Sequence, residues 1–299
     1  VSILMSTYNG AQWLPVLFES LIQQTHQDWM LYIRDDGSQD QTIKVLNNYE
    51  ARDPRVKIIK TCAAHRGPQQ SFFWLLEHVP GDAPYIMFCD QDDFWHADKI
   101  EVTLEAMLSA ESQESPQTPV LVHTDMRLVN ADMKILAPSF MKNMGFKTLT
   151  GNIFSRLLVQ NVISGCTMMI NKRLAQVCLP SPEAALMHDW WIALVAADLG
   201  RIVYLERGTI DYRLHGCNAS GSNIRRMPLV QGLARLFSQP THFDKLMQAR
   251  FSQSLALESH LSRFQPASAH SVLKQFHQDV RQGWWKAILS AYKHGVAMQ

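Results

Sequence analysis

The sequence lacks several features that would assign it to a specialised class of protein. Its 299 residues contain no low-complexity tract and no evident internal repeat, and 46% of them are hydrophobic. The apolar runs fall well short of the roughly 20 residues that span a bilayer. No basic segment with a long apolar run precedes the first predicted strand, so we expect no signal peptide. The composition indicates a globular protein of one large or two moderate domains.

Cysteine is scarce, and its spacing excludes two further classes. The chain has 5 cysteines, an odd number, and none of them forms a C-x-x-C pair. This pattern argues against a disulfide-stapled scaffold and against a zinc site. We expect reduced, mostly packed thiols in a cytoplasmic protein at Cys62, Cys89, Cys166, Cys178 and Cys217.

Three acids within four positions follow an apolar run at residues 85–89. The run predicts a buried strand, and in an open α/β sheet the carboxyl ends of strands face the ligand crevice. Alternation along an extended chain would place Asp90 and Asp92 on one side, where their oxygens could bind one divalent cation, with Asp93 following them. The alternative is an acidic turn that caps a helix expected to begin near residues 97–98.

A second predicted strand, at residues 29–34, also ends in acids. Asp35 and Asp36 follow it directly, and Gly37 permits a tight turn after them. Two strands would therefore bring carboxylates to the same edge of one sheet. Ser38 and Gln41 predict a capping box for the helix that comes next.

A third strand of this kind opens the chain at residues 1–6 and runs into Thr7 and Tyr8. Leucines at helical spacing then predict a helix over residues 14–22. Pro15 fits only in the first turn of that helix.

The second half of the chain offers further candidates, each with a plainer explanation. Residues 121–125 and 162–170 read as strands, and Gly165 inside the second suggests that something approaches the backbone closely, although packing explains it equally well. Asp189 begins an apolar helix and is either an N-cap or a functional carboxylate. His215 ends a strand-like run, and a lone histidine is more often structural than a metal ligand.

Taken in order, these segments resemble glycosyltransferase family 2. The motifs are S-T-Y-N-G, D-D-G-S-x-D, D-Q-D-D-x-W, H-D-W-W and Y-R-x-H-G-x-N, and they span roughly residues 1–220. Five co-linear motifs are far more specific than any one of them. The last three are similar to those of bacterial rhamnosyltransferases that build cell-surface polysaccharides.

The resemblance implies an α/β fold of the GT-A type, a Rossmann-like mixed sheet flanked by helices, with a C-terminal helical extension. We expect the GT-A domain over residues 1–222 and a basic helical region over 223–299. It also implies a pocket for the nucleotide base of the donor, with Asp36 accepting from a pyrimidine N3–H. That pocket would consist of Thr7, Tyr8 and Asp36, with Asp35 as a weaker candidate.

The remaining roles implied by the resemblance concern the chemistry. Asp90 would lie near the ribose of the nucleotide-sugar donor, and Asp92 and His215 would bind Mg²⁺ or Mn²⁺ at its diphosphate. Asp189 matches the catalytic base of an inverting transferase, although His188 replaces the carboxylate that commonly precedes it. The implied donor is dTDP-L-rhamnose, or a UDP-sugar as an alternative. The acceptor would be a hydroxyl of a cell-surface polysaccharide or lipid-linked glycan.

Two rival functions use the same residues. A non-catalytic nucleotide-sugar-binding module would show decay of the site, but candidates for the base pocket, metal site and catalytic base are all present. A nucleotidyltransferase would usually carry a basic, glycine-rich phosphate loop after the first strand. Residues 7–10 contain neither Lys nor Arg.

Charge is distributed unevenly along the chain, although its net value is only +1. Residues 223–299 hold ten Lys or Arg and three Asp or Glu, whereas the first 222 residues hold 18 and 24. A helix expected over residues 283–296 carries Trp284 and Trp285 among basic residues. It could lie on a cytoplasmic membrane surface or pack on the catalytic domain. No recognition motif supports nucleic-acid binding.

Overall fold

Four parallel strands from the first part of the chain form one half of the sheet. They are β1 (Ser2–Thr7), β2 (Met30–Asp35), β3 (Val56–Ile58) and β4 (Tyr85–Cys89). β1 lies between β2 and β4, and β3 pairs with the outer side of β2. Their register aligns Thr7 with Asp35 and Met5 with Cys89, so the carboxyl ends meet at one edge as expected. The computed structural model describes all residues except 61–64, 81–82, 147–152, 217–239, 267–269 and 296–299.

The other half of the sheet is mixed in direction. β8 (Met168–Asn171) runs antiparallel to β4, and β6 (Val120–Asn130) runs antiparallel to β8. β9 (Arg201–Leu214) then pairs in parallel with β6, and β5 (Phe94–Trp95) is antiparallel to β9. β7 (Ile135–Ala137) pairs with β6 off the main path. Over the described residues the order is β3-β2-β1-β4-β8-β6-β9-β5.

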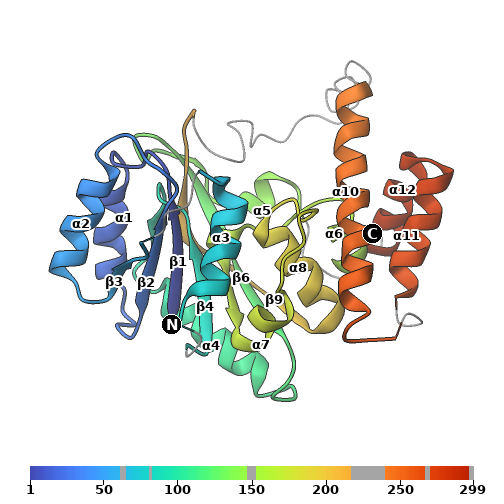
Figure 1. The fold of residues 1–299 in the computed structure, drawn as a ribbon, viewed down its shortest axis with the longest axis horizontal. Helices are drawn as coiled ribbons and strands as arrows, with labels where there is room; N and C mark the ends of the chain where they lie inside the picture. Colours follow the sequence, from blue (N-terminus) through green and yellow to red (C-terminus); the bar gives the residue numbers. More distant parts are fainter. Residues whose placement is uncertain (61–64, 81–82, 147–152, 217–239, 267–269, 296–299) are drawn as a thin grey trace.

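Helices cover both faces of this sheet (Figure 1). α1 (Leu14–Ile22), α2 (Thr42–Arg52) and α4 (Lys99–Glu111) pack in one apolar cluster, which also holds Ile3 and Met5 of β1. α3 (Gly67–His78), α7 (Lys172–Val177) and α8 (His188–Leu199) pack in another, which holds Leu4. Successive β1 side chains thus enter opposite cores, as the pleat requires. Because both faces of β1 are buried, the carboxyl end of the strand, which carries polar residues, is held in a fixed position.

Two shorter helices and the tail complete the fold. α5 (Phe140–Asn143) and α6 (Ile153–Leu157) follow β7. The C-terminal part forms α10 (Pro240–Leu261), α11 (Ser271–Gln282) and α12 (Trp284–Gly295), drawn in orange to red at one end of the molecule (Figure 1). Leu257, Leu261 and Phe276 are buried in the same apolar cluster as α8. The described part of the tail therefore shares the core of the sheet domain.

The aromatic residues of the last helix contact the tail itself. Trp284 meets Phe251 edge to face, and Trp285 stacks on Phe243 with ring centroids 5.6 Å apart. The expected domain boundary at residues 222/223 falls outside the described residues. Within the part of the chain that the structure describes, no helix is long and apolar enough to cross a bilayer.

Two local predictions from the sequence were wrong. Residues 162–170 are not one strand: Gly165–Thr167 form a 3₁₀ turn, and only β8 after it is extended. Ser164 explains the difference, because its carbonyl accepts bonds from the backbone and hydroxyl of Thr167. The capping box is also absent: α2 begins at Thr42 with Gln41 as its capping residue, so Ser38 lies too far before the helix to cap it, and its hydroxyl donates to Asp35 instead.

Several local predictions were confirmed. Pro15 lies in the first turn of α1. Three of the cysteines, Cys89, Cys166 and Cys178, are buried free thiols, and the other two lie outside the described residues. Burial holds the pKa of the Cys89 and Cys166 thiols well above their usual range.

Candidate active site

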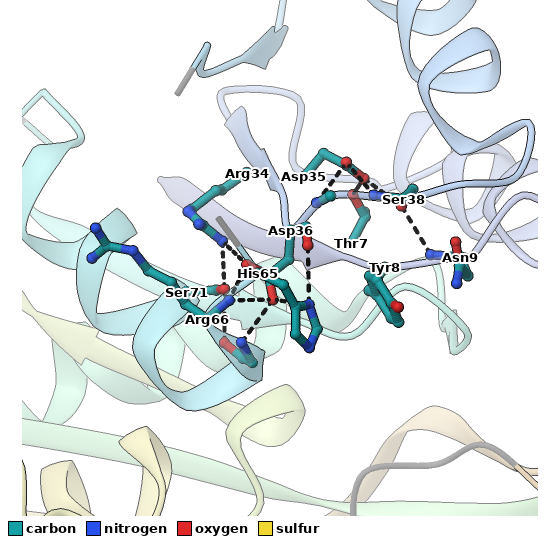
Figure 2. Close-up of polar contacts among 12 residues, drawn as sticks. Thr7, Tyr8, Asn9, Arg34, Asp35, Asp36, Ser38, His65, Arg66 and Ser71 are labelled. Carbon is teal, nitrogen blue, oxygen red and sulfur yellow. Dashed lines mark hydrogen bonds and ion pairs between the residues drawn. The ribbon is translucent and has the colours of Figure 1, made fainter. Parts of the chain in front are cut away.

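Asp35 organises the turn that joins the ends of β1 and β2. Its carboxylate accepts four hydrogen bonds: from the hydroxyls of Thr7 (2.9 Å) and Ser38 (2.6 Å), and from the backbone N–H groups of Gly37 and Ser38. The Ser38 hydroxyl in turn accepts from the backbone of Asn9. Figure 2 shows this group on one side of the two strand ends. Thr7 and Asp35 therefore lie together as predicted, but their side chains are hydrogen-bonded to each other.

Asp36 is held from the opposite side by three different donors. Its carboxylate accepts from the Arg34 guanidinium and from the backbone N–H groups of Arg66 and Gly67. His65 Nδ1 donates to the Asp36 carbonyl oxygen (3.0 Å) and lies 2.9 Å from Asp36 Oδ2. The Asp36 side chain is 2% exposed and that of Arg34 is fully buried. Burial alone would raise the pKa of Asp36, but the bonds from Arg34, Arg66 and Gly67 outweigh it and hold the pKa below its usual value.

Tyr8 and His65 form the exposed rim of this region. Their ring centroids are 4.5 Å apart with the planes tilted by 44° (Figure 2). Gln91 fixes the Tyr8 backbone, because its side-chain amide accepts from the Tyr8 N–H (2.9 Å) and donates to the Tyr8 carbonyl (3.0 Å). Gln91 lies inside the D-Q-D-D-x-W motif, but no signal in the sequence indicated that it would hold the Tyr8 backbone.

The acid triplet occupies a turn between β4 and β5 rather than an extended segment, and it does not cap α4. Asp90 and Asp92 both line the main cavity, whereas Asp93 is fully buried and accepts from the backbone N–H of Arg213. Burial and the nearby Asp92 carboxylate raise the pKa of Asp90 to about 7. Arg213 also donates from Nε to the Asp92 carbonyl. It belongs to the Y-R-x-H-G motif, but the sequence pattern did not indicate this role.

The predicted metal ligands Asp92 and His215 meet directly. His215 Nε2 lies 2.6 Å from Asp92 Oδ2 although the residues are 123 positions apart, and the His215 ring stacks on Trp13. A carboxylate oxygen and an imidazole nitrogen converging beside Asp90 suit Mg²⁺ or Mn²⁺. Asp90, Asp93 and Cys166 also approach within 4.8 Å of one another. Cys166, however, keeps its thiol proton and is a poor ligand for a hard cation.

Asp189 lies in the first turn of α8, which begins at His188 with Met187 as its capping residue. The N-cap explanation for Asp189 is therefore wrong. Its carboxylate accepts from the Asn161 side chain (3.0 Å) and from the backbone N–H groups of Gly165 (3.0 Å) and Trp190 (2.6 Å). Burial exceeds the effect of these bonds and raises the pKa of Asp189 to about 6.

His188 is the close neighbour that Gly165 accommodates. A Cβ on Gly165 would lie 2.6 Å from His188 Nε2, which no side chain could tolerate without movement. The His188 ring packs against Phe72 and Phe88, and burial lowers its pKa to about 3, so it is neutral. Neither ring nitrogen has a hydrogen-bond partner among the described residues.

One cavity of about 670 Å³ connects these groups. Its wall includes Tyr8, Asp36 and His65 at one end, Asp90, Gln91 and Asp92 in the middle, and His188, Asp189 and Trp190 at the other. Among the aromatic residues of the D-Q-D-D-x-W and H-D-W-W motifs, Trp95 and Trp191 are fully buried core residues. Trp190 lines the cavity and donates from its indole N–H to the Leu157 carbonyl.

Known proteins share both the sequence pattern and the fold. A family model described as glycosyl transferase family 2 matches residues 2–171. The dTDP-rhamnosyl transferase RfbG of Shigella flexneri is 27% identical over 230 residues, which cover 74% of this chain and 74% of that protein. The putative teichuronic acid biosynthesis glycosyltransferase TuaG of Bacillus subtilis is 32% identical over 221 residues, covering 73% and 77%.

Solved structures show the same architecture at low sequence identity. S. aureus TarS 1–349 in complex with UDP-GlcNAc superimposes with a TM-score of 0.59 at 15% identity, over 98% of this chain and 89% of that one. The mannosyltransferase PcManGT from Pyrobaculum calidifontis, in complex with GDP-Man and Mn²⁺, gives 0.56 at 13% identity, over 98% and 85%. These likenesses establish the GT-A fold, a mixed sheet flanked by helices with further helices at the C-terminus.

Proposed function

Because the chain belongs to glycosyl transferase family 2 and is a glycosyltransferase, we propose that it transfers L-rhamnose from dTDP-L-rhamnose to a hydroxyl of a polysaccharide or lipid-linked glycan. The observation that carries this proposal is the single cavity that joins Tyr8, Asp36 and His65 to Asp189 by way of Asp90 and Asp92. A nucleotide sugar has the same order of parts: base, ribose, diphosphate and sugar. The rhamnosyl donor is supported by the relative whose name states that substrate.

Asp189 is the proposed catalytic base. An acceptor hydroxyl is a poor nucleophile at neutral pH, so its proton must be removed as the oxygen attacks the anomeric carbon. A pKa of about 6 leaves Asp189 ionised at pH 7 while keeping it a stronger base than an ordinary carboxylate. Attack opposite the diphosphate in a single displacement inverts the anomeric centre, so a β-linked donor sugar gives an α-linked product.

Asp92 and His215 are the proposed metal ligands, and Asp90 lies beside them in the cavity. When bound, Mg²⁺ or Mn²⁺ would offset the negative charge that develops on the departing nucleoside diphosphate. The ligand atoms come from two segments that Arg213 ties together, since it donates to Asp92 and Asp93. Contacts within the chain therefore help to position both proposed ligands.

A panel of nucleotide sugars tests the donor. Purified protein with Mn²⁺ is screened by thermal shift, because tight binding to the folded state raises the unfolding temperature. The proposal expects dTDP-L-rhamnose to give the largest shift and to yield an inverted rhamnoside with a suitable acceptor, checked by NMR of the anomeric proton. A larger shift with a UDP-sugar would replace the rhamnosyl donor with the alternative.

Slow donor hydrolysis separates an enzyme from a binding module. Without acceptor, a competent transferase should release nucleoside diphosphate slowly in the presence of Mn²⁺, and Asp189→Asn should reduce that release. Binding of donor without any release by wild type would favour a non-catalytic module.

The tail supports a second proposal, that the enzyme binds the cytoplasmic face of a membrane, where lipid-linked acceptors occur. Trp285 and Leu289 on α12 are 44% and 61% exposed although their helix packs on the core. Co-sedimentation with anionic vesicles at low and high salt tests it, because salt screens attraction between basic residues and lipid phosphates. Trp285→Ser with Leu289→Ser should weaken binding, and a wild-type protein that stays in the supernatant at low salt contradicts the proposal.

A further inference from the structure

A second cavity lies away from the one that holds Asp90, Asp92 and Asp189. Its volume is about 330 Å³, and residues of α11, α12 and the end of α6 line it. This volume falls at the lower end of the range for sites that bind small molecules. None of the residues proposed for donor binding or for transfer lines this cavity. The proposed reaction therefore does not account for it.

A row of polar side chains forms one wall of the second cavity. Ser271, Gln275 and Asp279 lie four positions apart on α11, so they share one face of the helix. Ser271 and Gln275 are exposed, whereas Asp279 is only 1% exposed. Ser290 of α12 adds a half-buried hydroxyl. The polar groups therefore run from the surface into the buried part of the cavity.

Asp279 lacks part of the hydrogen bonding that a buried carboxylate needs. Its Oδ1 accepts from the Gln275 side chain (3.0 Å) and lies 3.5 Å from Lys286 Nζ. Its Oδ2 is buried and has no hydrogen-bond partner among the described residues. An unpaired buried oxygen is unfavourable, and a ligand with an O–H group can supply the donor. The χ2 torsion of Asp is soft, so the carboxylate can turn toward such a donor.

The rest of the lining is apolar and consists of Leu158, Val272, Phe276, Ala287 and Ala291. A lipid chain would fit these side chains but would leave Asp279 without a donor. An anion would be repelled by the Asp279 carboxylate. A sugar ring has C–H groups on its faces and hydroxyl donors around its edge. Its chemistry therefore matches both parts of the lining.

We propose that this second cavity binds one sugar unit of the glycan acceptor, at a distance from the site of transfer. The inference rests on the proposed function and gives the acceptor a second contact with the enzyme. α6 packs against both α8 and α12 (Figure 1), and the Leu157 carbonyl at its end accepts from Trp190 of the main cavity. A glycan long enough to occupy both cavities binds more tightly, because its second contact is intramolecular.

The test uses methyl NMR of the full chain labelled at its alanine methyl groups. Methyl α-L-rhamnopyranoside, which has the linkage of the proposed product, is the sugar probe, and n-butylammonium is a cationic probe without hydroxyls. Ala287 and Ala291 report on the second cavity, and Ala110, buried on α4, is the reference. Release of nucleoside diphosphate from the donor with Mn²⁺ is measured on the same samples.

Three variants separate sugar binding from folding. Asp279→Asn replaces one acceptor oxygen by an amide nitrogen, which cannot accept. Ser290→Leu fills part of the cavity from a half-buried position, where the larger side chain can be accommodated. Asp244→Asn makes the same chemical change as the first variant at an exposed position of α10, and is the matched control.

In wild type and Asp244→Asn, the sugar should shift the Ala287 and Ala291 methyl signals in a saturable manner and leave Ala110 unchanged. Asp279→Asn should weaken sugar binding by about tenfold or more, because a sugar hydroxyl loses a charged acceptor. Ser290→Leu should abolish the shifts, while its unfolding temperature and its donor hydrolysis stay at the wild-type values.

Three results would overturn the inference: no shifts in wild type, tighter binding of n-butylammonium than of the sugar, or unchanged sugar binding in Ser290→Leu. Donor hydrolysis without sugar-dependent shifts would remove the second site and leave the proposed function intact. Sugar-dependent shifts without donor hydrolysis would support the sugar site and overturn the proposed transfer reaction.

Discussion

The two ends of the cavity contain the same residue type in opposite environments. At the proposed nucleobase end, Asp36 is buried but accepts from three donors, and its pKa lies below the usual value. At the proposed reaction end, Asp189 is also withdrawn from solvent and accepts three hydrogen bonds, yet its pKa rises to about 6. The pKa of Asp90, in the middle of the cavity, rises to about 7. The difference is the charge of the donors, because only Asp36 is paired with a guanidinium. A buried aspartate becomes structural or reactive according to its partners.

The largest effect on turnover is expected from replacing Asp189, the proposed catalytic base. Asp189→Asn should reduce the turnover number by about 10²- to 10⁴-fold, because a carboxamide keeps the shape but cannot accept the acceptor's proton. Donor affinity should stay at the wild-type value, which calorimetry can confirm. Transfer within a few-fold of wild type would show that another group is the base.

Asp92→Asn should abolish the dependence of donor binding on metal. The substitution removes a charged oxygen ligand, and His215 alone holds too little charge for Mg²⁺ or Mn²⁺ at the diphosphate. Donor titrations with and without Mn²⁺ measure the effect. His215→Ala is expected to weaken the metal dependence less, and an unchanged dependence in Asp92→Asn would remove that residue from the metal site.

At the proposed nucleobase end of the cavity, replacing Asp36 is expected to lower the stability of the fold. Asp36→Ala leaves the buried Arg34 guanidinium without its carboxylate, and breaking such a pair costs about 3–5 kcal/mol. Urea unfolding gives the free energy of unfolding. Glu114→Ala, which removes a half-exposed ion pair with Arg201, is the control and should cost no more than about 1 kcal/mol. A small loss for Asp36→Ala would erase the contrast between the two ends.

The smallest effect is a shift with pH. Because the pKa of Asp189 is raised to about 6, the proton is bound below that pH and the base is lost. The value of kcat/KM should therefore rise from pH 5 to 7 and fall about tenfold per unit well below pH 6. His188 stays neutral over this range because its pKa is lowered to about 3. A flat profile from pH 5 to 7 would contradict the role of Asp189.

The sequence predicted where the polar groups gather but not what each of them contacts. Apolar runs gave β1, β2 and β4, and aligned parallel strands necessarily bring Thr7, Asp35 and Asp90 to one edge. The donors that hold Asp36 could not be predicted, because Arg66 and Gly67 lie 30 or more positions away. Local periodicity contains no information about such contacts.

Other misses have similar causes. The alternation rule was applied to Asp90 and Asp92 as if the chain stayed extended, but the strand ends at Cys89 and the acids lie in a turn. Asp93 enters the core because Arg213, 120 positions away, supplies its partner. Residues 162–170 looked like a strand because apolar composition cannot reveal that the backbone of Ser164 and Thr167 closes a turn.

The two hydrogen bonds between the Gln91 side chain and the Tyr8 backbone hold these two segments of the enzyme at a fixed distance from each other. Tyr8 lies on the rim at one end of the cavity, and Gln91 stands between Asp90 and Asp92. In the proposed donor site, this one amide would set the distance between the nucleobase and the diphosphate. Gly10 provides the clearance, since a Cβ there would lie 2.6 Å from Gln91 Cδ. A side chain at position 10 would displace the Gln91 amide and so change the spacing between Tyr8 and the acids. In the proposed site, a residue that need touch neither chemical group of the donor would thus set the separation between them.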